Sequence, residues 1–247
     1  MNNSIEKPIE LYEWKTKVRT FDADMQKNIT LSAILRFQQE IGELQLAKVG
    51  ATYESLVKNG IIFLLSTADV KILKYPKLNE EIIIKTWHQG NKGVKFIRCY
   101  QIYSLTGELL TEGKSVFVMI NPKTRKIQRP EIFIDNYKCI GNNKDVNIVE
   151  DKLKKQEDME KTGIKKLYYS DIDYNGHLNN TKYADILYDY IPEEYKKNLP
   201  LIKEFHIKFC SEGVLNKDID IYTKSDNNTI YYRGETDKTC FLAAAYI

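Results

Sequence analysis

The sequence predicts an α+β protein made of two copies of one unit, in which a helix packs on an antiparallel β-sheet. Three observations predict this class. A polar loop motif occurs twice, an amphipathic segment follows each copy, and runs rich in β-branched and aromatic residues come after it. Of the 247 residues, 43% are hydrophobic and 11% are aromatic, which is enough to form a real core.

The loop motif reads DADMQKNIT from residue 22 and DIDYNGHLN from residue 171, at an offset of 149. The alignment pairs the following residues: Asp22 with Asp171, Asp24 with Asp173, and Thr30 with Asn179. A second match, at an offset of 137, places residues 68–82 on residues 205–219. The second copy therefore has about a dozen fewer residues between loop and strand, and we expect its helix or the following connection to be shorter.

Each loop is expected to lead into a helix, because Thr30 and Asn179 are residue types that accept backbone N–H bonds at a helix start. Apolar residues then recur at helical spacing. They are Ile34, Phe37, Ile41 and Leu44 in the first copy, and Tyr183, Ile186, Leu187, Tyr190 and Ile191 in the second. The expected strands lie near residues 61–74, 80–88, 94–105 and 109–120, then 218–224, 229–235 and 240–247. A turn at Thr106-Gly107 joins the third and fourth of these strands.

One helix laid across a long antiparallel sheet is the hot-dog arrangement, and two copies in one chain form an internal pseudo-dimer. We expect an N-terminal hot-dog domain over residues 1–135 and a C-terminal one over residues 163–247. The segment between them, residues 136–162, is charged and poor in large apolar residues, which is typical of a linker.

Composition excludes several classes of function. A net charge of +3 is too weak and dispersed to indicate nucleic-acid binding. The start of the chain lacks a signal-peptide pattern, and no apolar run approaches membrane-spanning length, so we expect a cytoplasmic protein without a membrane partner. The four cysteines show neither zinc-ligand spacing nor a disulfide framework, and we expect no metal and no cofactor.

The second loop carries chemistry that the first lacks. Asp173, Asn175 and His177 offer a carboxylate, an amide and an imidazole that titrates near neutral pH, whereas the first copy has Gln26 and Asn28 in place of the last two. Such residues in a polar loop often serve only as turn and cap groups. A purely structural role would be needed in both copies, so the difference favours catalysis in the second copy.

The stretch DIDYNGHLNNTKY, residues 171–183, resembles the signature of the acyl-acyl-carrier-protein (acyl-ACP) thioesterases, a family of tandem hot-dog enzymes. The resemblance implies that Asp173, Asn175 and His177 are catalytic, together with a Glu on the neighbouring strand that matches Glu212. It also implies that the first repeat, with its degenerate site, shapes the pocket for the acyl chain. Plant members carry a Cys directly after this Glu, where this chain has Gly213, which puts a cysteine nucleophile in doubt.

Thioester hydrolysis fits these residues. Asp173 can attack the carbonyl to form an anhydride or can activate water, and N–H groups at the next helix start are candidate donors to the oxyanion. Glu212 is a candidate to activate water. In a regular strand, however, Glu212 shares a face with His206, Lys208 and Cys210, so its assignment needs a bulge or a strand end before it. Cys210 is a packing residue or an alternative nucleophile. His206 is a surface or packed histidine rather than a ligand, and His88 lacks partners at metal-ligand spacing.

The main hypothesis is therefore a thioesterase that hydrolyses fatty acyl-ACP to free fatty acid and holo-ACP in fatty acid biosynthesis. The alternatives are an acyl-coenzyme A thioesterase, or a non-catalytic acyl-binding module, since a fold does not fix a function. Acyl carrier protein is acidic, and four basic residues are candidates to dock it: Lys123, Arg125, Lys126 and Arg129. The expected state is a monomer or a homodimer.

Overall fold

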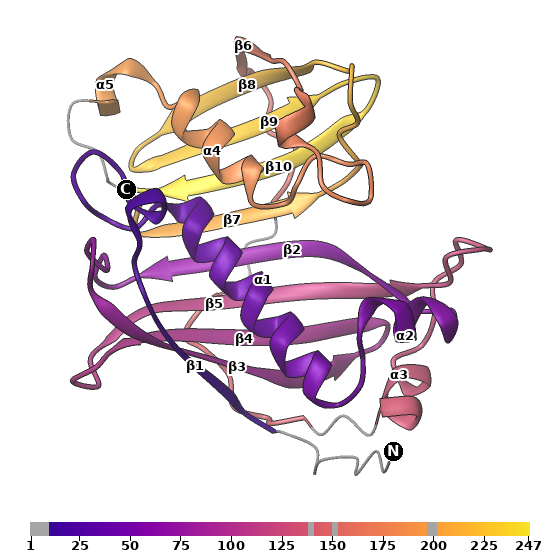
Figure 1. Ribbon diagram of the computed structural model, residues 1–247. Coiled ribbons are helices and arrows are strands. Elements are labelled where there is room, and N and C mark those ends of the chain that lie inside the picture. The colour runs from indigo at the N-terminus through magenta and orange to yellow at the C-terminus, as the bar shows by residue number, and fades with distance from the viewer. Residues whose placement is uncertain (1–9, 138–140, 150–152, 197–201) are drawn as a thin grey trace.

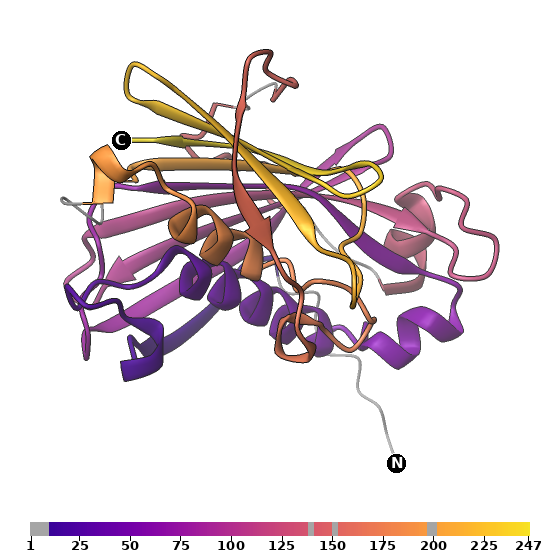
Figure 2. The same cartoon turned by 90° about the horizontal axis from the view of Figure 1, so that it is seen from above.

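The computed structural model describes residues 10–137, 141–149, 153–196 and 202–247. These residues form one ten-stranded antiparallel sheet with helices on one of its faces (Figures 1 and 2). The strands are β1 (Tyr12–Lys17), β2 (Ile62–Ile72), β3 (Glu81–Lys92), β4 (Lys95–Ser104), β5 (Leu109–Ile120), β6 (Glu160–Lys165), β7 (Glu204–Phe209), β8 (Ile219–Asp226), β9 (Thr229–Glu235) and β10 (Thr239–Tyr246). The α-helices are α1 (Leu31–Lys48), α2 (Tyr53–Lys58), α3 (Glu131–Tyr137), α4 (Lys182–Asp189) and α5 (Glu193–Lys196), and short 3-10 turns occupy η1 (Thr20–Asp22) and η2 (Tyr169–Asp171).

The order of strands shows that the chain contains two copies of one structural unit. From the middle of the sheet outward, the first half runs β2-β5-β4-β3-β1 and the second half runs β7-β10-β9-β8-β6. The halves join where β2 pairs with β7 (Figure 1). In that ladder Asp69 pairs with His206, and these two positions are related by the 137-residue offset of the repeat. A pseudo-twofold axis therefore passes between them, which confirms the tandem hot-dog architecture.

The two loops share most of their turn geometry and backbone hydrogen bonds. The left-handed position of the turn is Lys27 in the first copy, with φ 62°, and Gly176 in the second, with φ 81°. Asn79 and Asn216, at φ 68° and 66°, form the equivalent turn before the next strand. The shared backbone bonds are Asp24 N to Asn28 O and Asp173 N to His177 O, Thr30 N to Asp22 O and Asn179 N to Asp171 O, and Ile29 N to Pro76 O and Leu178 N to Gly213 O.

The helices follow the sequence expectation in type but not in every boundary. Thr30 caps α1 as predicted, because its Oγ1 accepts the Ala33 N–H at 3.1 Å. The prediction that the second helix starts at Asn179 was wrong. Asn179 Oδ1 accepts from Thr181 N at 2.9 Å and from Thr181 Oγ1 at 2.8 Å, and this local turn delays the start of α4 to Lys182. As expected from the offsets, the second helix is shorter, with 8 residues against 18.

The predicted strands are all present, and two more were missed. Strands β1 and β6 form the two edges of the sheet, and β6 lies across the predicted boundary at residue 162. Part of the predicted linker, residues 141–149, packs on the sheet, where Val146 and Ile148 form a buried cluster with Trp87. The proposed division of the chain into domains stays a prediction.

Helices α1 and α4 cover the same face of the sheet (Figure 2). Apolar residues from both repeats, including Ile34 and Phe37 of α1 and Ile186 and Leu187 of α4, belong to one buried cluster. In the part of the chain that the structure describes, no helix is long and apolar enough to cross a membrane.

Candidate active site

The loop before α4 holds Asp173 in a fixed orientation. Its Oδ1 atom accepts the backbone N–H of Asn175 at 2.8 Å and of His177 at 3.3 Å. Among the described residues, no group forms a hydrogen bond with its Oδ2 atom. One carboxylate oxygen therefore fixes the loop, and the other is available for chemistry.

His177 and Glu212 meet in space, although 35 positions separate them in the chain. His177 Nε2 lies 3.1 Å from Glu212 Oε2. The strand β7 ends at Phe209, and both Cys210 N and Ser211 N donate to Cys240 O, so the regular alternation of the strand stops before Glu212. This break brings Glu212 to the side of His177 and removes the conflict over its face that a regular strand would create.

Arg125 reaches the same site from the first repeat. It lies in the turn after β5, at φ 56°, and its Nη2 is 3.3 Å from Glu212 Oε1. The two oxygens of Glu212 are thus divided between His177 and Arg125. Sequence reasoning marked Arg125 only as a surface cation, and no local pattern could have paired it with a residue 87 positions away.

The first repeat has different residues at the equivalent positions. At the position equivalent to His177 it has Asn28, whose Oδ1 accepts a hydrogen bond from Lys77 Nζ. At the position equivalent to Glu212 it has Tyr75, which is largely buried and donates to Ile202 O at 2.6 Å. Burial raises the pKa of Tyr75 far above its ordinary value. Asp24 keeps the loop, with Oδ1 accepting from Gln26 N and Asn28 N at 2.9 Å each, so the backbone is preserved without the titratable pair.

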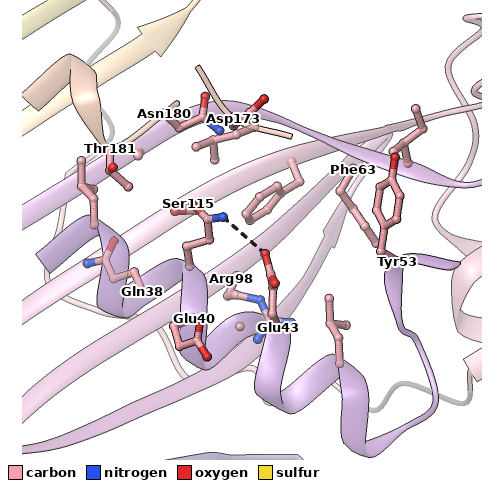
Figure 3. A pocket seen from close by; sticks show the side chains of 18 of the residues that line it. Gln38, Glu40, Glu43, Tyr53, Phe63, Arg98, Ser115, Asp173, Asn180 and Thr181 are labelled. Carbon is pink, nitrogen blue, oxygen red and sulfur yellow. Dashed lines mark hydrogen bonds between the residues drawn. The ribbon is translucent and has the colours of Figure 1, made fainter. Parts of the chain in front are cut away.

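A cavity of about 480 Å³ lies between α1 and the first half of the sheet and extends to the second loop. Asp173 and Asn175 line it together with residues of α1, α2, β2, β4 and β5 (Figure 3). At the junction of the repeats, the rings of Tyr53 and Tyr174 pack edge to face with centroids 5.4 Å apart. Phe37 and Ile41 are core residues, and the α1 residues at the cavity are others, including Leu35, Gln38, Gly42 and Leu46.

The start of α4 offers fewer free N–H groups than the sequence suggested. The N–H of Thr181 donates to Asn179 Oδ1, and that of Lys182 donates to Asn179 O at 2.9 Å. The amide side chains of Asn175 and Asn180, which line the cavity, are candidates to donate to an oxyanion there.

His206, His88 and Cys210, the other residues considered from the sequence, are not part of the His177–Glu212 arrangement. His206 Nδ1 is 2.8 Å from Asp69 Oδ1 in the joint between the repeats. His88 stacks on Phe96 at 3.7 Å, and burial, followed by the charge of Arg98, lowers its pKa from 6.5 to about 4. Burial raises the pKa of the Cys210 thiol, which disfavours the thiolate needed for attack. Within the described residues, no group of three or more His, Cys, Asp or Glu side chains could hold a metal ion.

Several known structures share this fold. An acyl-ACP thioesterase from Bacteroides thetaiotaomicron superposes with a TM-score of 0.86 and 18% identity, over 96% of this chain and 97% of that one. The 12:0-ACP thioesterase from Umbellularia californica superposes with a TM-score of 0.81 and 17% identity, over 96% of each chain.

Known sequences are also similar. The oleoyl-acyl carrier protein thioesterase 1 of Arabidopsis thaliana is 26% identical over 200 residues, which are 74% of this chain and 55% of the relative. A palmitoyl-acyl carrier protein thioesterase of Gossypium hirsutum is 28% identical over 231 residues, which are 86% of this chain and 54% of the relative. The chain thus spans about half the length of these relatives, both of which are named as chloroplastic.

Two family models cover most of the chain. The acyl-ACP thioesterase N-terminal domain matches residues 10–137, and the acyl-ACP thioesterase C-terminal domain matches residues 151–239. With both halves matched in order on a tandem hot-dog fold, the chain belongs to the acyl-ACP thioesterase family.

Proposed function

We propose that the chain hydrolyses the thioester of fatty acyl-ACP and releases free fatty acid and holo-ACP, as a step of fatty acid biosynthesis. One observation carries the proposal. Asp173, whose Oδ2 atom has no hydrogen bond among the described residues, lines a cavity large enough for an acyl chain. His177 of the same loop pairs with Glu212, and the equivalent positions of the first repeat hold Asn28 and Tyr75 instead. The names of the relatives support an acyl-ACP substrate. Location in the cytoplasm and oligomeric state stay predictions.

Asp173, Asn175, His177 and Glu212 divide the chemistry. Asp173 Oδ2 takes a proton from the attacking water or itself attacks the carbonyl carbon. In the water route the new C–O bond forms to water, the C–S bond breaks, and the proton taken by Asp173 passes to the leaving sulfur. In the anhydride route the C–O bond forms to Asp173 as the C–S bond breaks, and water then hydrolyses the anhydride, which releases the fatty acid, restores the carboxylate and supplies the proton that the sulfur gains. Asn175 donates to the oxygen on which negative charge develops. Glu212 accepts from His177 Nε2, which orients the ring and leaves Nδ1 to hold or release a proton.

The two routes for Asp173 leave different traces. Attack by its carboxylate forms an acyl anhydride, so a rapidly quenched reaction would yield a peptide containing residue 173 with the mass of the acyl group added. Activation of water leaves that peptide unmodified at all times. Mass spectrometry of the quenched enzyme distinguishes the routes.

The carrier is proposed to dock on the basic loop, residues 121–129. Lys123, Arg125, Lys126 and Arg129 are exposed there, and Arg125 contacts Glu212. An acidic carrier bound at this loop would hold its thioester arm close to the site. Removing all four charges should raise KM for the carrier-bound substrate at low salt. An unchanged KM would contradict this docking site.

The function is tested by thiol release from a panel of acyl-ACP substrates of different chain length, with His177→Ala measured beside the wild type. Release that depends on His177 is expected. If a folded wild-type protein releases no thiol from the whole panel, the proposal is wrong. The same acyl chains on coenzyme A then test the alternative carrier, and lipid binding without turnover would indicate a binding module.

A further inference from the structure

Inside the cavity, the side chain of Gln38 on α1 is buried without a hydrogen bond. Gln38 is 3% exposed, and among the described residues neither its Nε2 nor its Oε1 has a partner. The amide lies over Gly113 of β5, where a Cβ atom would stand 2.1 Å from Nε2. Glycine at this position therefore makes room for the amide. A buried amide without partners opposes folding, so its presence here needs a reason.

Arg98 of β4 lies in the same part of the cavity, and it is also 3% exposed. Its Nη1 donates to Gln45 Oε1 and, at 3.2 Å, to Thr86 Oγ1. No carboxylate of the described chain forms an ion pair with Arg98, and neither its Nε nor its Nη2 has a hydrogen bond to a described residue. A buried guanidinium without a counter-charge is rare, because desolvation of the charge is costly.

The sheet register brings these groups together. Tyr100 pairs with Gly113, and Arg98 pairs with Ser115 two positions further along the same strands. Both pairs therefore lie on the same face of the sheet. Gln38, Arg98, Tyr100 and Ser115 all line the cavity. Figure 3 shows Gln38 and Arg98 on the side of the cavity away from Asp173. The polar group is therefore separated from the proposed reacting carbonyl by the space that an acyl chain would occupy.

An unsubstituted hydrocarbon chain cannot form hydrogen bonds with Gln38 and Arg98. Methylene groups laid against Gln38 and Arg98 would exclude water from their donors and acceptor and give no hydrogen bond in return. An oxygen atom on the chain would accept from both side chains. Two glutamates of α1, Glu40 and Glu43, also line the cavity, but both are exposed and neither forms an ion pair with Arg98. Arg98 is therefore the buried charge of this group.

We infer that the cavity selects acyl chains that carry an oxygen function along their length, a hydroxyl, a ketone or a terminal carboxylate, through Gln38 and Arg98. This inference rests on the proposed function, because it names the class of acyl group that the thioesterase prefers. Gln38 would bind any of the three groups, as an amide both donates and accepts. Arg98 would favour the carboxylate most, because that group alone neutralises its charge.

The test compares one chain length on acyl carrier protein in three forms: unsubstituted, hydroxylated at successive positions, and ended by a carboxylate. The measured quantity is the ratio of kcat/KM for an oxygenated chain to kcat/KM for the unsubstituted chain. In the wild type, the best oxygenated chain should exceed the unsubstituted chain by roughly tenfold or more. In Gln38→Leu, which is of similar size and leaves no unsatisfied amide, the ratio should fall towards one because the unsubstituted chain reacts faster.

Two further variants separate the contributions. Arg98→Met should remove the advantage of the carboxylate-ended chain, with a thermal melt to show that the protein is folded. Lys48→Met removes a cation from the exposed end of α1, outside the cavity, and should leave the ratio unchanged. A wild-type ratio of one or less for every oxygenated chain would overturn the inference while the thioesterase function stands, as would a ratio that Gln38→Leu does not lower. No hydrolysis of any chain would instead overturn the proposed function.

Discussion

The duplicated loop allows a matched pair of substitutions that separates catalysis from structure. Asp173→Asn removes the proposed catalytic carboxylate but keeps an oxygen that can accept the two backbone N–H groups at 2.8 and 3.3 Å. Asp24→Asn makes the same change in the first repeat, where the two bonds are 2.9 Å each. Because the two loops share their backbone bonds, the structural cost of the two changes should be nearly the same.

The magnitudes follow from these contacts. Each substitution turns two charge-assisted hydrogen bonds into neutral ones, which should lower the free energy of unfolding by about 1 kcal/mol. For a chain of this size, that corresponds to a fall in Tm of about 2–4 °C. Loss of a general base or nucleophile lowers kcat by roughly 10²–10⁴-fold. Asp173→Asn should therefore lose activity and little stability, whereas Asp24→Asn should lose a similar amount of stability and keep its activity.

Both proteins would be measured by thermal melting and by thiol release from acyl-ACP under saturating substrate. The reasoning is refuted if Asp173→Asn keeps more than about a tenth of the wild-type kcat. It is also refuted if Asp24→Asn loses as much activity as Asp173→Asn, because the two carboxylates would then have the same structural role in their repeats. A fall in Tm much larger than expected in either variant would show that an amide cannot replace the carboxylate in this loop.

Three further predictions concern neighbouring groups. Arg125→Ala removes one of the two contacts of Glu212. Because exposed ion pairs contribute about 0.2–1 kcal/mol, kcat should fall up to about fivefold more than in the control Lys126→Ala, which removes the same charge without that contact. Equal kcat values for the two variants would contradict a positioning role for Arg125. Burial lowers the pKa of His88 from 6.5 to about 4, so the unfolded state binds more protons between these values and the free energy of unfolding should fall by roughly 2–3 kcal/mol as pH drops from 6.5 to 4. Denaturant titration at each pH measures the free energy of unfolding, and in His88→Gln this part of its fall should be absent. If His88→Gln and the wild type show the same dependence of unfolding free energy on pH, other groups cause the loss. Cys210→Ser should keep kcat within about twofold, because burial raises the pKa of the thiol; loss of turnover in a folded Cys210→Ser protein would restore the cysteine as a candidate nucleophile.

The sequence was most informative where a pattern repeats within a few residues. The central strands are rich enough in β-branched and aromatic residues to be found with small errors at their ends. The edge strands β1 and β6 were missed because their sequences, YEWKTK and EKTGIK, carry charges at alternate or terminal positions and little apolar signal. Edge strands are half solvated, and charge there discourages pairing with other chains.

Of the site, the sequence could reveal the part that lies in a repeated local pattern. The loop containing Asp173 and His177 was visible because a second copy of it lacks the imidazole. Glu212 depended on a strand ending three residues earlier, which no periodicity reveals. Arg125, Gln38 and Arg98 were out of reach as site residues, because their positions depend on how the two repeats and the helix lie on the sheet.

The contacts across the pseudo-twofold axis explain why both repeats are needed although one carries the proposed chemistry. The cavity lies mainly between α1 and the first half of the sheet, whereas Asp173 and Asn175 reach it from the second. Arg125 crosses in the opposite direction to contact Glu212. A separated second repeat would thus lose the cavity and this contact together, and it would also expose the edge of β7 that pairs with β2. Because the His177–Glu212 pair lies in the second repeat, the first repeat is free to vary as an acyl pocket. The amide of Gln38, which has no hydrogen bond, and the guanidinium of Arg98, which has no counter-charge among the described residues, both lie in that first repeat.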